Sequence, residues 1–386
     1  MDQFYEYLRE QPTASLSITV GIGYALWYVV YIAKRPVLAA NPRMQGFLLR
    51  HCGSLRRKFW PTFWCWEARL QTILRTLIKT SPDVPYKKEF LNTSDGGHVA
   101  LDWVQNDSGS PYVSSVRPTV LMMPGLTGSS HESYARHLVK QATDRGYRAL
   151  VFNNRGIGGA DLKTPRTYNA TNIEDLCEVI AHIKGRYPDS PLLGVGVSMG
   201  GLLLTNYLAK KGKDTPMVGA MSISAAWDIF ATSKVLEEPL NSFLFNRHLT
   251  ENLIEHLNKH RAIFQGNFDI DSASKSRTIR EFDDRFTAKQ FGYPSYKEYY
   301  IEATIATKID DIHIPYLALN SADDMFSPGH SIPLDKAAAS KNVAIAMTDH
   351  GGHIGFLEGI FPRGANLMDK LLGEFADAIF KHGHEL

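Results

Sequence analysis

Short apolar segments alternate with stretches of helical periodicity through the last two thirds of the chain. Turn-forming residues bound each segment, and several segments lack the apolar–polar alternation of a half-exposed strand, which is typical of strands buried on both faces. The apolar segments cover residues 119–123, 149–153, 192–197, 218–224, 316–320 and 343–347. Helical periodicity separates most of them, notably at 131–142, 173–186 and 200–210. The alternation predicts an α/β fold, with a mostly parallel central sheet and helices on both of its faces.

One of these segments ends in a nucleophile motif. The chain reads Gly196-Val197-Ser198-Met199-Gly200 at the end of the apolar run 192–197 and at the start of a helical stretch. A serine on a strand-to-helix turn needs flanking glycines, because the backbone there turns too tightly for a Cβ atom. The motif alone is weak, but its setting is typical of the α/β-hydrolase fold and indicates Ser198 as the nucleophile.

A serine nucleophile needs a base, which in turn needs an acid to orient it. In this fold the acid and then the histidine follow the serine along the chain. His353 meets this requirement, since it lies beyond the last predicted strand and directly after two glycines. His350 is the nearby alternative, but it lacks the Gly-Gly lead-in.

The acid should follow the penultimate strand, where the loop offers two adjacent carboxylates, Asp323 and Asp324. The acid usually precedes an x-apolar-x-Pro run, and the residues from Asp324 to Pro328 fit that register. The pattern favours Asp324 and keeps Asp323 as the fallback. In the favoured case Asp323 would hydrogen-bond the backbone of its own turn.

An oxyanion hole requires two backbone N–H donors aimed at the developing negative charge. One should be the N–H of Met199, the residue after the nucleophile. The other should come from the loop after residues 119–123, which begins Pro124-Gly125-Leu126. We predict the Leu126 N–H as the second donor.

The interval between residues 227 and 316 breaks the alternation, because it contains helical, charged sequence and no strong strand. It is too long for a plain crossover connection. We therefore predict a helical cap over the substrate site at about residues 228–312. Residues 87–92 and 98–103 flank Asp95-Gly96-Gly97 and predict a β-hairpin, so the hydrolase domain should cover residues 86–386.

Residues 14–33 form a run of twenty residues without a charge. At about 1.5 Å per residue such a helix spans about 30 Å, the thickness of a bilayer's hydrocarbon core. The start of the chain is not basic and no small-x-small site precedes Lys34, which argues against a cleaved signal peptide. The run predicts a transmembrane helix. Basic residues at its C-terminal end, Lys34 and Arg35 among them, would place the following domain in the cytosol.

Residues 34–85 form a basic, aromatic-rich juxtamembrane segment with five aromatic side chains between Phe59 and Trp66. Leu70, Ile73, Leu74 and Leu77 follow at helical spacing. The segment would lie on the bilayer surface or pack on the hydrolase domain, and packing is the favoured interpretation.

Composition argues against other classes of function. A formal net charge of +2 gives no basic surface for nucleic acid. Three scattered cysteines provide neither a disulfide framework nor zinc-ligand spacing. The glycine-rich loop 153–159 lacks a phosphate-binding lysine, so we interpret it as a structural turn in which Arg155 braces neighbouring loops. We predict no cofactor, no metal and no obligate protein partner.

Several further motifs, taken together, resemble a known family. The chain is similar to the abhydrolase-domain (ABHD) subfamily, near the bacterial YheT-like esterases, over nearly its whole length. The closing His382-Gly383-His384-Glu385-Leu386 favours the phospholipase branch of that subfamily. The other motifs are Phe59-Trp60-Pro61-Thr62, Asp95-Gly96-Gly97, Leu101-Asp102-Trp103, Pro124-Gly125-Leu126-Thr127-Gly128, Asn153-Asn154-Arg155-Gly156, Arg280-Glu281-Phe282-Asp283-Asp284, Asn320-Ser321-Ala322-Asp323-Asp324 and the run from Gly351 to Gly359.

The resemblance implies a single-pass membrane hydrolase of lipid esters, located in the endoplasmic reticulum or another endomembrane. For the phospholipase branch it implies phosphatidylcholines with medium-length or oxidatively shortened acyl chains as substrates. It also implies a cytosolic N-terminus, opposite to the orientation that the flanking charges favour. Two alternatives remain: a general carboxylesterase or monoacylglycerol lipase, and a non-catalytic lipid or sterol receptor on a hydrolase scaffold.

Overall fold

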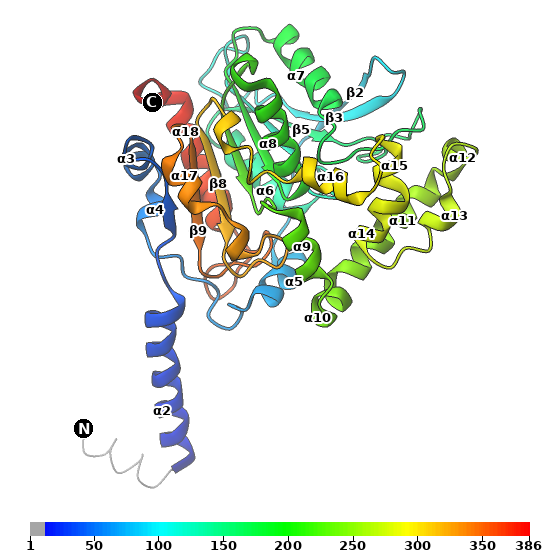
Figure 1. Cartoon of the computed structure of the whole chain (residues 1–386). Helices are drawn as coiled ribbons and strands as arrows, with labels where there is room; N and C mark the ends of the chain where they lie inside the picture. Colours follow the sequence, from blue (N-terminus) through cyan, green and yellow to red (C-terminus); the bar gives the residue numbers. More distant parts are fainter. Residues whose placement is uncertain (1–11) are drawn as a thin grey trace.

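The computed structural model describes residues 12–386 and is built around one nine-stranded sheet (Figure 1). The strand order is β1-β9-β8-β7-β6-β4-β5-β3-β2. The pairs β9–β8, β8–β7, β7–β6, β6–β4 and β4–β5 are parallel, and the other pairs are antiparallel. The strands are β1 (Val37–Ala39), β2 (Lys87–Asn92), β3 (His98–Val104), β4 (Thr119–Met123), β5 (Arg148–Asn153), β6 (Leu192–Val197), β7 (Met217–Ile223), β8 (Tyr316–Ser321) and β9 (Val343–Thr348).

The predicted mostly parallel sheet is therefore confirmed, including the β2–β3 hairpin, whose turn contains Gly96 at a φ of 82°. Strand β1 was not predicted. It has only three residues and follows a proline, and its sequence shows no period-2 pattern. It pairs with the edge strand β9, from Val37 opposite Met347 to Ala39 opposite Ile345. The juxtamembrane segment thus completes one edge of the sheet.

Helices cover both faces of the sheet and form two apolar cores. One core contains side chains of α3 (Pro42–His51), α4 (Gly53–Arg56), α6 (Ser133–Thr143) and α18 (Leu367–His382). The other contains side chains of α7 (Glu174–Arg186), α8 (Met199–Lys211) and α17 (Leu334–Ala339). Because every residue of β4, β5, β6 and β8 is buried, these strands need no polar face, which explains why their central residues are apolar.

The interval between β7 and β8 folds as a group of short helices beside the sheet (Figure 1). Six of its buried side chains, among them Phe264, Phe282 and Phe286, form a small apolar core of their own. The helices are α9 (Ile229–Leu236), α10 (Pro239–Asn241), η3 (Ser242–Asn246), α11 (Arg247–Lys259), α12 (Arg261–Phe264), α13 (Ile270–Ala273), α14 (Ile279–Phe282), η4 (Asp283–Thr287), α15 (Ala288–Gln290), α16 (Tyr296–Ala303) and η5 (Ile309–Asp311). We call this group the cap helices.

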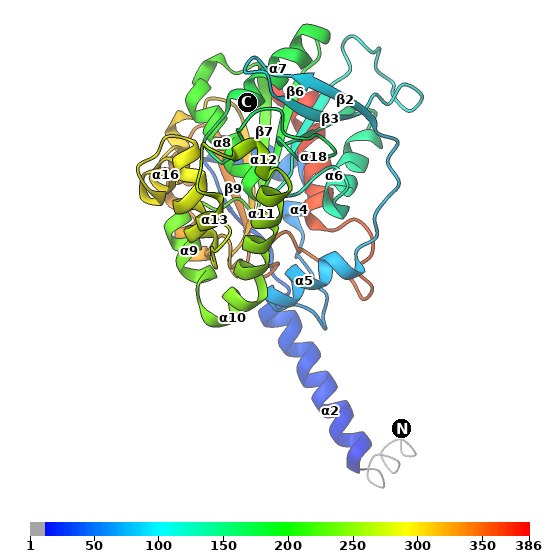
Figure 2. The same cartoon turned by 90° about the vertical axis from the view of Figure 1, so that its right-hand side faces the viewer.

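Helix α2 (Pro12–Trp27) continues without interruption into η1 (Tyr28–Ile32) and projects away from the domain (Figures 1 and 2). The twenty residues Thr13–Ile32 are long and apolar enough to cross a membrane, and among them only Tyr28 and Ile32 are buried. Only the end of this helix contacts the domain. There the hydroxyls of Tyr24 and Tyr28 donate hydrogen bonds to the carbonyl oxygens of Phe63 and Pro61.

Helix α5 (Ala68–Ile78) lies at the end of the domain from which α2 emerges (Figure 2). Its orientation was not expected from its leucine spacing. The buried side chains of α5 are Ala68, Gln71, Thr72 and Arg75. Leu70 and Leu77, by contrast, are 46% and 74% exposed. The helix therefore buries three polar side chains and leaves Leu70 and Leu77 outside, while Ile73 packs on an apolar cluster with Ala68.

Candidate active site

Ser198 occupies a sharp turn between β6 and α8. Its φ and ψ of 54° and −118° lie in a region that residues with a side chain rarely adopt. The flanking glycines make this turn possible: a Cβ atom on Gly196 would collide with the Gly200 carbonyl, and one on Gly200 with the Met123 carbonyl. The turn raises the serine side chain above the carboxyl ends of the parallel strands.

Three of the predicted residues meet in a chain of hydrogen bonds. His353 Nε2 lies 2.9 Å from Ser198 Oγ. On the other side of the ring, His353 Nδ1 lies 2.9 Å and 3.1 Å from the two carboxylate oxygens of Asp324. Asp324 is 1% exposed and also accepts the Phe326 N–H at 2.7 Å. This geometry suits a histidine that takes the serine proton while a buried carboxylate fixes its tautomer.

Asp323, the fallback acid, has a different environment. Its carboxylate accepts the Gly352 N–H at 2.9 Å and lies 3.1 Å from Nδ1 of His350. Asp323 therefore holds the turn that carries His353, and no hydrogen bond joins Asp323 to the His353 ring. His350, the alternative base, faces Asp323 rather than Ser198.

Two residues without a recognisable sequence signal position His353. The hydroxyl of Thr72 on α5 accepts the His353 backbone N–H at 2.9 Å. The Phe326 ring stacks on the imidazole, with 4.1 Å between ring centroids. Both contacts join segments far apart in the sequence, so local patterns could not have revealed them.

The two predicted oxyanion donors have no acceptor within the described part of the chain, residues 12–386. The neighbouring N–H groups of Gly125 and Thr127 are occupied by the hydroxyl oxygens of Tyr134 and Tyr168, at 3.0 Å and 3.1 Å. The N–H groups of Leu126 and Met199 make no such bond. Because both residues line the same cavity as Ser198, their N–H groups remain available to a substrate oxygen.

A cavity of about 620 Å³ opens above Ser198 and His353. Its lining includes Ser198 and His353, which follow β6 and β9, together with residues of α5 and of the helices between β7 and β8. Leu202, Leu236, Leu244 and Phe286 are among its many apolar lining residues. A cavity of this size, with these apolar side chains in its lining, accommodates an acyl chain.

The glycine-rich loop after β5 has the structural role that the sequence predicts. Arg155 is 2% exposed and makes ion pairs with Asp175 and Asp95 at 2.6 Å and 2.7 Å. These bonds tie the β2–β3 turn to the start of α7. The Arg155 guanidinium lowers the pKa of Asp95 below its ordinary range, so that carboxyl stays ionised and paired.

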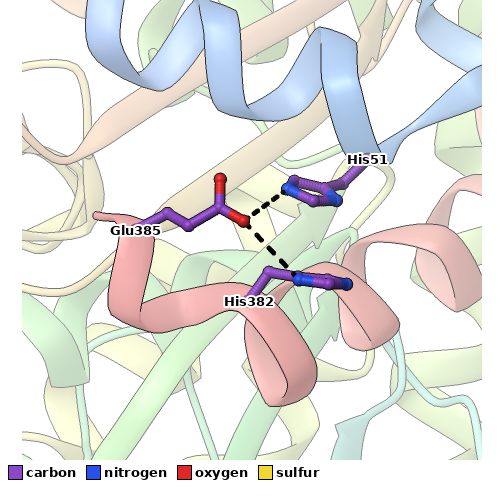
Figure 3. Close-up of side chains that lie close together, drawn as sticks. All are labelled: His51, His382 and Glu385. Atoms are coloured by element: carbon purple, nitrogen blue, oxygen red, sulfur yellow. Dashed lines mark hydrogen bonds and ion pairs between the residues drawn. The ribbon is translucent and has the colours of Figure 1, made fainter.

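A group of possible metal ligands lies far from the cavity, where α18 meets α3 (Figure 3). His51 Nε2 and His382 Nδ1 lie 3.1 Å and 3.5 Å from the same carboxylate oxygen of Glu385. The two imidazole rings are stacked, with centroids 4.2 Å apart and planes inclined by 16°. Through Glu385 these side chains join the residues that follow α18 to α3.

The family model described as "alpha/beta hydrolase fold" matches residues 118–360, which include all five predicted site residues. A human protein named Phospholipase ABHD3 is 47% identical over 374 residues, which cover 96% of this chain and 91% of that protein. The Putative esterase YheT of Escherichia coli is 32% identical over 295 residues, 76% of this chain and 85% of that protein.

Among solved structures, the α/β hydrolase GrgF from Penicillium sp. sh18 superposes with a TM-score of 0.50. It covers 78% of this chain and all of its own length at 15% identity, a likeness of fold alone. The family model, the identity to the relatives and the strand order agree. The chain therefore belongs to the α/β hydrolase fold family.

Proposed function

We propose that this ester hydrolase cleaves acyl esters of membrane phospholipids through an acyl-enzyme on Ser198. One observation carries the proposal: the hydrogen-bonded chain Ser198–His353–Asp324 opens into a cavity with an apolar wall. A phospholipid presents a polar ester beside a long acyl chain, which matches a polar floor beside an apolar wall. The similarity to a protein named as a phospholipase supports the same substrate class.

The proposed reaction has two acyl-transfer steps. Ser198 Oγ attacks the ester carbonyl carbon while His353 Nε2 takes the serine proton, and the N–H groups of Met199 and Leu126 stabilise the oxyanion. His353 then gives that proton to the departing glycerol oxygen as the ester bond breaks. In the second step His353 deprotonates a water molecule that attacks the acyl-enzyme. The fatty acid leaves and Ser198 recovers its proton.

Membrane anchoring by residues 13–32 is the second part of the proposal. Tyr24 lies eight residues before Ile32, about 12 Å along the helix axis. A bilayer's headgroup layer is about 5–7 Å thick on each side, taken from its total and hydrocarbon thickness. The loop around Phe63 accepts the Tyr24 hydroxyl. Even if Ile32 lay at the outer surface of the headgroup layer, this loop would therefore reach the boundary of the hydrocarbon region. The anchor holds the domain against the membrane instead of at a distance.

The side chains of the loop between Phe59 and Trp66, next to the anchor, suit a position at the boundary of the hydrocarbon region. Trp60, Phe63 and Trp64 are 42–44% exposed. Its polar groups are largely satisfied internally: the Pro61 and Phe63 carbonyls accept tyrosine hydroxyls, and the Trp64 indole N–H donates to the Ile360 carbonyl at 2.9 Å. Apolar side chains outside and paired polar groups inside are what an interfacial environment requires.

The substrate class can be tested by titrating the active serine with a fluorophosphonate and comparing rates per labelled site. We expect medium-chain phosphatidylcholine in vesicles to react faster than p-nitrophenyl acetate or monoacylglycerol. Higher rates on the small esters would instead indicate a carboxylesterase or monoacylglycerol lipase. Failure of the protein to react with the fluorophosphonate, together with binding of lipid without turnover, would indicate a receptor.

A further inference from the structure

The inward face of α5 carries three polar side chains, and two of them have clear structural partners. Gln71 donates to the Cys65 carbonyl at 2.6 Å and accepts the Leu357 N–H at 2.7 Å. Thr72 accepts the backbone N–H of His353. Arg75 follows on the same face and has no comparable partner. Its guanidinium requires another explanation.

Arg75 is a buried cation without an acceptor in the described part of the chain. It is 8% exposed, and its Nε and Nη1 atoms are enclosed without a hydrogen bond. The centroid of the Tyr134 ring lies 5.3 Å from the guanidinium carbon, and Glu132 and Asp369 act on the charge from a distance. Burial lowers the pKa of Arg75, as expected for a charge removed from water.

The charged groups near Arg75 do not neutralise it by direct contact. Asp369 is paired with Lys79 at 2.6 Å, and both side chains of that pair are fully buried. Glu132 lines the same cavity as Arg75 but makes no ion pair with it. An uncompensated buried charge is destabilising, and such groups are concentrated at sites where a ligand supplies the missing partner.

The guanidinium also lies close to the reacting centre. Arg75 lines the cavity that contains Ser198. Tyr134, which Arg75 stacks on, accepts the Gly125 N–H through its hydroxyl at 3.0 Å. Gly125 belongs to the loop after β4 that carries the predicted oxyanion donor Leu126, called here the oxyanion loop. It is packed against Ser198, since a Cβ atom on Gly125 would lie 3.3 Å from the Ser198 Cβ. Arg75 is thus separated from the oxyanion loop by a single tyrosine ring.

We propose that Arg75 binds the phosphodiester of the substrate's headgroup. This inference rests on the proposed phospholipase function and assigns the residue that would distinguish phospholipids from neutral glycerolipids. In a glycerophospholipid the phosphate is a few covalent bonds from the acyl ester, so an ester at Ser198 brings the phosphate near the tyrosine ring. A guanidinium pairs with two phosphate oxygens at once, and its unpaired N–H groups supply the donors.

The test compares two substrates with identical acyl chains, dioctanoyl phosphatidylcholine and dioctanoylglycerol, on the full-length protein. In Arg75→Met we expect kcat/KM for the phospholipid to fall about tenfold or more, the loss typical of a charged hydrogen-bond pair. The value for dioctanoylglycerol should stay within about twofold, since it has no phosphate for Arg75 to bind. Arg75→Lys should give an intermediate loss, because an ammonium keeps the charge without the planar pair of donors.

Thermal unfolding separates binding from a structural role. If Arg75 serves the ligand, removing its unpaired charge should leave Tm unchanged or raise it. A lowered Tm together with equal losses on both substrates would overturn the inference. Equal rates of wild type and Arg75→Met on the phospholipid would also overturn it while leaving the proposed function intact.

Two further outcomes concern the ligand and the function itself. If free phosphate were the ligand, inorganic phosphate would inhibit dioctanoylglycerol hydrolysis by the wild type but not by Arg75→Met. The preference for phospholipid over dioctanoylglycerol would then be the same in the wild type and in Arg75→Met. This pair of results would contradict a headgroup site. A wild type that hydrolyses dioctanoylglycerol but no phospholipid would contradict the proposed function, and the inference with it.

Discussion

At the scale of single residues, the adjacent carboxylates Asp323 and Asp324 have different environments. Asp324 faces the His353 ring, whereas Asp323 accepts the backbone N–H of Gly352. The proline register favours Asp324 from sequence, and the hydrogen bonds of Asp324 to His353 Nδ1 agree with that choice. We expect Asp324→Asn to lower kcat/KM on a short ester by about 10⁴-fold, because the imidazole would lose its oriented tautomer. The measurement is steady-state hydrolysis by the solubilised protein.

Asp323→Asn is the matched control, since it changes the neighbouring carboxylate in the same way. It should lower kcat/KM by less than about tenfold, because an amide oxygen can still accept the Gly352 N–H. Equal losses in the two variants, or a larger loss for Asp323→Asn, would assign the acid to Asp323.

A buried carboxyl in the cap gives a second prediction at this scale. Burial raises the pKa of Asp283 from 3.8 to about 7, and the Tyr300 hydroxyl lies 3.0 Å from it. Between these two values the folded protein keeps a proton that the unfolded chain has lost, so stability should decrease as pH rises from about 4 to about 7. Asp283→Asn should weaken this dependence, as measured by urea unfolding across that range. An unchanged slope in Asp283→Asn would contradict the assignment.

At the scale of elements, α5 explains why part of the candidate site could not be predicted from sequence. The spacing of Leu70, Ile73, Leu74 and Leu77 indicates a helix correctly, but apolar periodicity identifies the buried face only when water surrounds the other face. On α5 the side that faces the interior carries polar side chains instead. Arg75 and Thr72 therefore resemble surface residues in the sequence, although they line the cavity.

The loop between Phe59 and Trp66 is proposed to contact lipid through its exposed tryptophans. Trp27, Trp60 and Trp64 are exposed where the domain meets the N-terminal apolar helix, whereas Trp103 and Trp227 are buried. In vesicles of dibrominated phosphatidylcholine, we expect the double variant Trp60→Phe/Trp64→Phe to lose about half or more of the lipid-quenched fluorescence. Phenylalanine keeps the apolar surface, so the variant should remain folded and active.

Two results would contradict this placement. A quenched amplitude equal to that of the wild type would mean that Trp60 and Trp64 remain in water. A wild type without any quenching would contradict the anchor itself, because Trp27 lies within the candidate span.

At the scale of the whole molecule, the chain order of serine, acid and histidine is predictable because parallel strands place their carboxyl ends at one edge of the sheet. Ser198 follows β6, Asp324 follows β8 and His353 follows β9, so three distant loops converge. The interval between β7 and β8 stands out in the sequence because it is too long for a crossover. Its packing against α5 depends on non-local contacts, such as Arg69 Nε to Asn241 Oδ1 at 2.9 Å, which no sequence pattern encodes.

Ser198 is tested most directly as the nucleophile by lipid profiling of membranes that contain either the wild type or Ser198→Ala at equal abundance. The wild type should convert phosphatidylcholine to lysophosphatidylcholine and free fatty acid. Ser198→Ala should reduce that rate by about 10⁴-fold or more, because the acyl-enzyme cannot form. Equal turnover of phosphatidylcholine in the two membranes would contradict Ser198 as the nucleophile.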